Sequence, residues 1–253
     1  MIHFWNGNKS AARQAYEHQL LALVLRYADI EQPIDNDLTD YPKARDEGLV
    51  FERGTDVLVT VAGNRKFADQ AFIEVPIPLC KGLLGCRVAI IPRARQAEFA
   101  NMSQQALKQQ RVGVPATWVD AELFRHNQYH VVEKGSLSEM LEWIASGEVD
   151  YMTLGANEAA EILAQYPQQT ASLMIEPTKV LTYPFPVVFY VSPSQQALAD
   201  ALTKGLREIM ANGEFDALFN AHFGQVLKQV DLASRETIAL ENPLLPQHYQ
   251  SPD

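Results

Sequence analysis

VPIPLCKGLLGCRVAIIP (residues 75–92) and LTYPFPVVFYVSP (residues 181–193) are two proline-punctuated stretches that divide this chain. Proline belongs at the starts and edges of strands rather than in the middle of a hydrogen-bonded ladder. A chain that leaves one globule and later re-enters it needs two crossings. We therefore predict two hinge strands, at about 76–82 and 183–189.

The hinges define the predicted domain organisation. Residues 1–78 and 187–253 form a discontinuous first lobe, and residues 82–182 form the second. A length of 253 residues suits two lobes or one large domain. The groove between two lobes is where a small molecule would bind.

Apolar periodicity predicts that both lobes alternate strands with helices. In the first lobe we predict strands over 3–5 and 56–61, and helices over 10–27, 41–53, 193–212 and 215–223, followed by an extended tail from residue 234. In the second lobe we predict strands over 87–91, 111–114, 129–132, 150–154 and 172–175, and helices over 96–109, 117–124, 136–147 and 157–165. The predicted fold class is therefore α/β.

Charge and hydropathy exclude two classes of partner. The 21 basic and 31 acidic residues give a net charge of −10, and no Lys/Arg cluster is long enough to follow a phosphate backbone. We therefore expect no nucleic acid. The apolar runs are too short to cross a bilayer, so we expect a soluble chain without membrane insertion.

The N-terminus and the cysteines each leave two readings open. Met1 leads straight into IHFW without the features of a secretory leader, so the leader has been removed from a periplasmic protein or the protein is cytoplasmic. Cys80 and Cys86 are the only cysteines. Two glycines between them allow the chain to turn back into a disulfide, whereas an extended strand would hold the two thiols apart.

The sequence contains no GxSxG, HExxH, P-loop or GxGxxG motif. His126 and His130 have HxxxH spacing, but residues 127–129 are expected to break the helix between them, so a shared metal is not predicted. We expect no cofactor, no metal and no catalytic residue.

Six segments, in this order, resemble the extracellular solute-binding proteins of family 3, which have the type II periplasmic binding fold. They are FERGTDVLVTVAGNRKFADQAFIEVPIPL (51–79), KGLLGCRVAIIP (81–92), VGVPATW (112–118), GEVDYMTLG (147–155), YPFPVVFYVSPS (183–194) and LTKGLREIMANGEFDALFNAHFG (202–224). The resemblance covers nearly the whole chain. It implies a two-lobed fold that closes on a small solute.

The resemblance also implies a ligand site at the carboxyl ends of the strands, in agreement with the general rule for open α/β sheets. Arg65 would grip a ligand carboxylate with its planar guanidinium, and Thr60 would add a hydroxyl. Thr117 would open a helix whose N–H groups favour an anion. The predicted ligand-binding residues are Trp5, Asn6, Thr60, Arg65, Thr117, Asn157 and Glu158.

Five of these residues also have a purely structural reading. Arg65 can pair with Asp69 at the surface, and Trp5 can pack in the core. Thr117 and Asn157 can serve as helix caps, while a glutamate at position 158 complements a helix dipole.

The chain departs from the family pattern at four places. Gly155 stands where amino-acid-binding members usually place an acidic residue for the ligand's amino group, and Glu158 is the nearest substitute. Pro115 removes a backbone donor. Asn64 replaces the acidic residue that usually precedes the arginine. Residues 75 and 77 are Val and Ile instead of the family's Ser and Tyr.

We therefore expect a solute-binding protein, whose anionic or amino-acid-like solute serves ABC-type uptake or sensing through a permease or a membrane sensor protein. The first alternative is an enzyme on the same scaffold, a dehydratase acting on a cyclic carboxylic acid with Glu158 as its general acid or base. The second is a degenerate interaction module that binds no solute.

Overall fold

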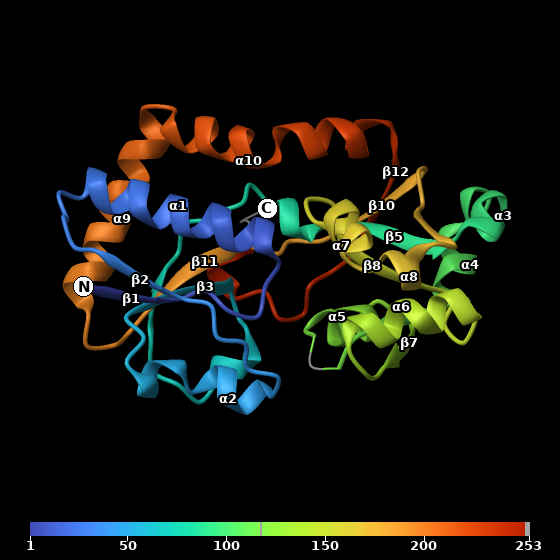
Figure 1. The fold of residues 1–253 in the computed structure, drawn as a ribbon, viewed down its shortest axis with the longest axis horizontal. Helices are drawn as coiled ribbons and strands as arrows, with labels where there is room; N and C mark the ends of the chain where they lie inside the picture. The colour runs from blue at the N-terminus through green and yellow to red at the C-terminus, as the bar shows by residue number, and fades with distance from the viewer. Residues whose placement is uncertain (117, 251–253) are drawn as a thin grey trace. The chain divides into compact units, whose positions relative to one another are not determined.

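The computed structural model describes residues 1–116 and 118–250 (Figure 1). The chain divides into two compact units. The first comprises Met1–Lys81 and Pro186–Gln225, and the second comprises Gly82–Phe185 and the chain from Val226 onward. Both units combine a sheet with helices, so the predicted α/β fold class is confirmed.

The sheet of the first unit has the strand order β2-β1-β3-β11-β4. These strands are β1 (Ile2–Trp5), β2 (Ile34–Asp37), β3 (Val57–Val61), β4 (Ile73–Val75) and β11 (Val187–Val191). β1 runs parallel to β2 and β3, whereas β11 runs antiparallel to β3 and β4. The parallel strands β1, β2 and β3 therefore end at one common edge of the sheet.

Helices α1 (Ala11–Tyr27) and α9 (Gln196–Ala211) pack against each other in the first unit. Ser10 caps α1 by accepting a hydrogen bond from Arg13 N. Short helix α2 (Ala44–Gly48) and a 3₁₀ turn over Val50–Arg53 lie below β1 and β3 in Figure 1, with α1 above them. Helix α10 (Glu214–Val230) begins in the first unit and ends in the second.

The sheet of the second unit has the strand order β12-β10-β5-β8-β6-β7, with β9 paired to β5. These strands are β5 (Cys86–Pro92), β6 (Arg111–Val114), β7 (His130–Glu133), β8 (Tyr151–Gly155), β9 (Leu173–Ile175), β10 (Lys179–Thr182) and β12 (Glu236–Ala239). The central strands β5 and β8 are antiparallel, and β8 is parallel to β6. All five residues of β8 are buried.

The helices of the second unit are α3 (Gln96–Ala100), α4 (Gln104–Gln109), α5 (Asp120–His126), α6 (Leu137–Ser146), α7 (Ala159–Gln165) and α8 (Pro167–Thr170). Ser136 and Glu139 form the predicted capping box at the start of α6, and Gly147 ends the helix in the left-handed conformation. α6 packs on β5, β6 and β8.

The prolines of the two predicted hinges interrupt the strands that we expected there. The segments 76–82 and 183–186 contain no strand, so the prediction of continuous crossing strands there is wrong. Pro76, Pro78, Pro184 and Pro186 have no N–H to give to a ladder. Of the second predicted hinge strand, only the part after Pro186 is a strand, and it belongs to β11.

The predicted assignment of the tail to the first lobe is wrong as well. Strand β12 pairs in parallel with β10, so the chain from Val226 onward belongs to the second unit. Glu176 strengthens this attachment, because Nη1 of Arg235 donates to the Glu176 carbonyl oxygen. The tail is thus part of a sheet rather than a surface wrap alone.

Two predicted helices are interrupted. The helix expected over 96–109 is split into α3 and α4, because Ser103 caps a new helix by accepting from Ala106 N. The helix expected over 41–53 is only α2 and the following 3₁₀ turn, which Gly54 ends at a φ of 93°. Cys80 and Cys86 are not joined by a disulfide bond.

Candidate functional site

The carboxyl ends of β1, β2 and β3 gather polar side chains in the first unit. Asn6 follows β1 directly and is completely buried. Its Nδ2 donates to the Gln14 carbonyl oxygen at 2.9 Å and to Asn36 Oδ1 at 3.1 Å. Its Oδ1 is buried without any hydrogen-bond partner. An unsatisfied buried acceptor costs about 1–3 kcal/mol, so Asn6 Oδ1 is a candidate contact for a ligand.

Trp5 is in the core of the first unit and is 2% exposed. Its indole Nε1 donates to the Thr39 carbonyl oxygen at 2.9 Å, and its ring lies 5.9 Å from that of Tyr41. The packing role is therefore evident. A contact between Trp5 and a solute stays a prediction.

Thr60 and Arg65 bracket the turn that follows β3. Thr60 is buried, and its Oγ1 accepts from Asn64 Nδ2 at 2.8 Å. Asn64 Oδ1 in turn accepts from Lys66 N, which starts the 3₁₀ turn Arg65–Phe67. Arg65 is exposed on this turn. The position that the family pattern fills with an acidic residue thus holds an asparagine that shapes the arginine-bearing turn.

A buried charge cluster beside this edge was missed by the sequence analysis. Lys9 Nζ donates to Glu17 at 2.5 Å and to the Val59 carbonyl oxygen at 3.1 Å. Arg13 Nη2 donates to the same carboxylate at 2.7 Å, and the Glu17 side chain is fully buried. Burial lowers the pKa of Lys9, although Glu17 opposes the shift. The i, i+4 spacing of Arg13 and Glu17 was the only sequence signal for this cluster.

In the second unit, the candidate site lies where β8 ends. Gly155 closes the strand, and Asn157 follows at 4% exposure. Neither Nδ2 nor Oδ1 of Asn157 has a hydrogen-bond partner. A Cβ on Gly155 would lie 2.6 Å from Asn157 Oδ1, 3.2 Å from Glu158 Oε1 and 3.5 Å from Arg87 Nη1. The missing side chain at position 155 therefore leaves room for three polar groups.

Arg87 is held by a network that joins three parts of the second unit. Its Nε donates to Tyr183 Oη at 2.7 Å, and its Nη2 donates to Asp120 Oδ1 at 2.7 Å. Tyr183 Oη donates to the same Asp120 oxygen at 2.6 Å. Burial alone would lower the pKa of Arg87, but Asp120 and Tyr183 raise it above its usual value. Burial also raises the pKa of Tyr183.

Thr117 lies outside the described residues, so its predicted ligand contact stays a prediction. The helix that it was expected to cap starts later than predicted, at Asp120, with Val119 in the capping position. The Asp120 carboxylate accepts hydrogen bonds from Arg87 and Tyr183. Trp118 N donates to the Pro115 carbonyl oxygen before this helix.

Buried side-chain nitrogen and oxygen atoms that lack a partner occur on three of the residues 1–116 and 118–250: Asn6, Tyr129 and Asn157. Two of these three were predicted from the sequence as ligand-binding residues. Polar groups that are buried and unsatisfied are rare in native proteins and call for an explanation such as an absent ligand or water.

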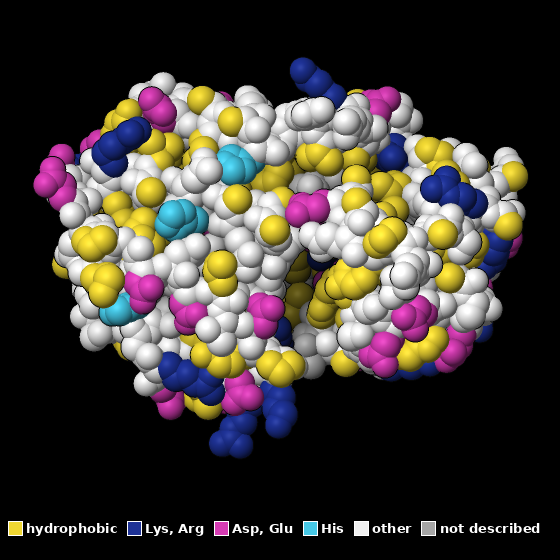
Figure 2. All heavy atoms as spheres, viewed as in Figure 1, with side chains coloured by type: hydrophobic (Ala, Val, Ile, Leu, Met, Phe, Trp, Pro, Cys, Tyr) yellow, Lys and Arg dark blue, Asp and Glu magenta, His cyan; other side chains and the backbone are white. Residues whose placement is uncertain are grey.

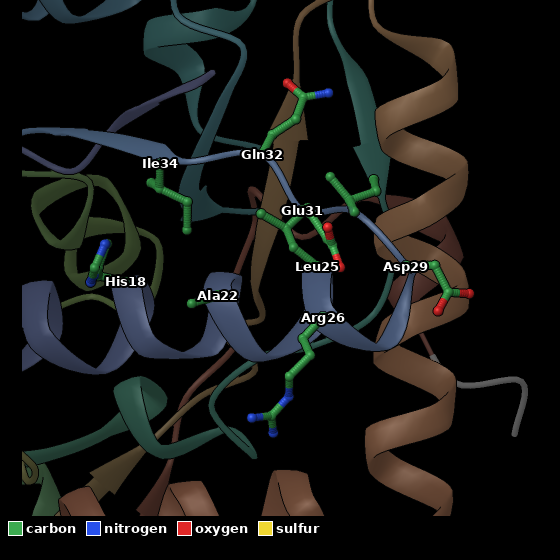
Figure 3. Close-up of a pocket in the computed structure, with 9 residues that line it drawn as sticks. His18, Ala22, Leu25, Arg26, Asp29, Glu31, Gln32 and Ile34 are labelled. Carbon is green, nitrogen blue, oxygen red and sulfur yellow. The ribbon is translucent and has the colours of Figure 1, made fainter.

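A pocket of about 530 Å³ lies elsewhere in the first unit, beside the C-terminal half of α1 and the loop before β2 (Figure 3). It contains none of the predicted ligand-binding residues. Arg26, Asp29 and Gln32 point in different directions in Figure 3. Its lining is formed by His18, Ala22, Leu25, Arg26, Asp29, Ile30, Glu31, Gln32 and Ile34.

On the face shown in Figure 2, basic and acidic side chains are interspersed. The described part of the chain contains no group of three or more His, Cys, Asp or Glu side chains that could hold a metal ion. None of its described helices is long and apolar enough to span a bilayer.

No protein-family model and no curated protein matches the sequence. Solved structures do match. An arginine third-transport-system periplasmic binding protein from Legionella pneumophila is similar over 88% of this chain and 99% of its own, with a TM-score of 0.63 and 14% identity. A periplasmic His/Glu/Gln/Arg/opine-family binding protein from Silicibacter pomeroyi, in complex with lysine, is similar over 88% and 97%, with a TM-score of 0.61 and 11% identity.

An amino-acid ABC transporter substrate-binding protein from Streptococcus pneumoniae, bound to L-arginine, is similar over 88% of this chain and 93% of its own. Its TM-score is 0.61 and its identity is 8%. These structures are binding proteins rather than enzymes. The chain therefore has the two-lobed α/β fold of the periplasmic amino-acid-binding proteins.

Proposed function

We propose that this protein binds a small solute that carries a carboxylate. The observation that carries the proposal is the pair of buried, unsatisfied asparagines. Asn6 follows β1 in the first unit and Asn157 follows β8 in the second. Ligands of open α/β sheets bind outside the carboxyl ends of strands.

Arg65 is the proposed carboxylate ligand of the first unit. It follows β3 on a turn that Asn64 and Thr60 shape, and it is exposed to solvent. Guanidinium can donate two parallel hydrogen bonds to one carboxylate.

We further propose that the protein acts in the periplasm and delivers its solute to an ABC permease or reports it to a membrane sensor protein. The structural neighbours support this class of partner, since they include periplasmic binding proteins and an ABC transporter substrate-binding protein. A ligand stabilises the conformation that it binds best, so the signal would be a shift of population.

The test is a thermal-shift screen with amino acids, dicarboxylates and aromatic acids. A ligand present at about 100 times its Kd stabilises the protein by about 2.7 kcal/mol. We expect a carboxylate-bearing compound to raise the Tm of the wild type and to have no effect on Arg65→Ala. Arg53→Ala is the matched control, because Arg53 is also an exposed arginine of the first unit and is not a predicted ligand-binding residue.

Undiminished affinity in Arg65→Ala would refute the assignment of the carboxylate contact. A screen in which no compound raises the Tm would refute solute binding. Turnover of a cyclic carboxylic acid by the purified protein, lost in Glu158→Gln, would favour the dehydratase instead.

A further inference from the structure

Glu47 of the short helix α2 is a buried acidic residue outside the set of predicted ligand-binding residues. Its Oε2 accepts a hydrogen bond from Lys66 Nζ at 2.8 Å and another from Asn8 Nδ2 at 2.7 Å. The two donors lie far apart in the sequence. One carboxylate oxygen therefore joins two separate segments of the first unit.

The first of these segments is the turn Arg65–Phe67, which carries the proposed carboxylate contact. Lys66 follows Arg65 directly, so its bond to Glu47 ties this turn to α2. Helix α2 also packs on the turn. A Cβ on Gly48 would lie 2.2 Å from the Lys66 carbonyl oxygen, so the two backbones are in close contact. The ion pair and the close contact together fix the place of the turn.

The second segment is the loop that follows Asn6. Asn8 in this loop has a left-handed backbone, with a φ of 55°. Its Nδ2 donates to the Tyr41 carbonyl oxygen at 2.8 Å, and its Oδ1 accepts from Tyr41 N at 2.7 Å. The bond to Glu47 attaches the same side chain to α2. The segments that carry Asn6 and Arg65 are thus both bound by Glu47.

The energetics favour a role of Glu47 in orientation over a role in stability. A buried ion pair contributes little net stability, because the desolvation of the two charges offsets their attraction. Its charge-assisted hydrogen bonds are nevertheless strong and directional. A helix of only five residues, such as α2, depends on tertiary contacts for its own place.

We infer that Glu47 is a positioning residue of the proposed solute site, because it fixes the Arg65 turn and the loop after Asn6 in one arrangement. It acts through Lys66 and Asn8, and it need not touch the solute. This inference rests on the proposed solute-binding function and adds to it a residue that sets the geometry of the site.

The experiment measures position and affinity separately. Position is read without ligand, from ¹⁵N–¹H spectra in which the backbone amides of Asn6 and Arg65 are assigned. Affinity is measured by calorimetry with L-lysine, glutarate and benzoate, one compound from each class of the screen. The variants are Glu47→Leu, Glu47→Gln and Lys66→Met. The matched control is Glu52→Leu, at an exposed glutamate of the 3₁₀ turn that follows α2.

We expect Glu47→Leu to shift the amide signals of both Asn6 and Arg65. It should also weaken every probe that the wild type binds by about tenfold, the size of effect that a hydrogen bond to a charged group provides. Lys66→Met should shift the signal of Arg65 and leave that of Asn6. Because both donors meet one oxygen, the amide oxygen of Glu47→Gln can still accept from them, so this variant should retain most of the affinity. Glu52→Leu should change neither readout.

Unchanged signals in folded Glu47→Leu, or shifted signals with unchanged affinity, would overturn the inference while leaving solute binding intact. Each variant's own Tm, measured without ligand, shows whether it is folded. If Glu47→Leu does not fold, Lys66→Met decides, and an unchanged Arg65 signal there overturns the inference. If no probe binds the wild type, the inference is overturned, and the broader screen with Arg65→Ala decides separately whether the protein binds a solute.

Discussion

Removing the carboxylate of Asp120 should destabilise the second unit strongly, because it leaves the Arg87 guanidinium buried without a counter-charge. The two side chains are only 7% and 6% exposed, and the ion pair spans 2.7 Å. Breaking a buried pair by removing one partner costs about 3–5 kcal/mol. Since Tyr183 Oη still accepts from Arg87 Nε, we expect Asp120→Ala to lie at the lower end, at about 3 kcal/mol.

Native-state hydrogen exchange measures this loss in each unit separately. The amides of β5 and β8 report on the second unit, and those of β3 report on the first as an internal control. We expect the free energy of opening to fall by about 3 kcal/mol in β5 and β8 and to stay unchanged in β3. Replacing both partners, by Arg87→Met with Asp120→Ala, should be less harmful than Asp120→Ala alone, because no unpaired charge stays buried.

The matched control is Asp46→Ala, which removes a carboxylate from an ion pair with Arg53 whose side chains are 39% and 40% exposed. Pairs at the surface contribute about 0–1 kcal/mol. A loss below about 1 kcal/mol in β5 and β8 of Asp120→Ala would refute the reasoning, because it would show that Arg87 is solvated or finds another partner.

Two further predictions concern close packing and acid stability. Gly85→Ala should destabilise the second unit by about 1–3 kcal/mol or prevent folding, because the added Cβ would lie 2.0 Å from the Tyr183 carbonyl oxygen, a backbone atom. Urea unfolding measures the loss of stability. A stability equal to that of the wild type would contradict this close packing. Burial alone would raise the pKa of Asp150, but hydrogen bonds from Arg111 and Arg95 lower it to about 2. Because this pKa is depressed in the folded state, its stabilising effect is complete above the unfolded value of 3.8 and is lost as the pH falls toward about 2. Arg111→Gln should therefore move the acid-unfolding midpoint, followed by circular dichroism, to higher pH, and an unchanged midpoint would show that this pair does not contribute.

The proposed site combines residues that the sequence predicted with residues that it did not. Asn6 and Asn157 were both predicted as ligand-binding residues, and both carry unsatisfied polar atoms in the structure. Arg87 was not selected, since an arginine inside a predicted strand gives no sign of its partners. Asp120 and Tyr183, which bind it, lie 33 and 96 residues away in the sequence.

The secondary structure likewise contains elements that the sequence predicted and elements that it did not. Helix α6 was predicted with its capping box and its glycine stop, because all of these signals lie within one short segment. Strand β12 was not predicted as part of the second unit. Its partner β10 lies more than fifty residues earlier in the chain, at Lys179–Thr182, and the four residues ETIA carry no local signal for that pairing.

The sequence by itself determined the alternation of strands and helices, the capping of the main helices and the two proline-rich crossings, because these depend on neighbours within a few residues. Only the tertiary structure decided which polar groups are satisfied. Satisfaction of a buried amide or guanidinium depends on groups brought together by the folded backbone, and their positions are set by the whole sheet rather than by the residues next to them in the chain.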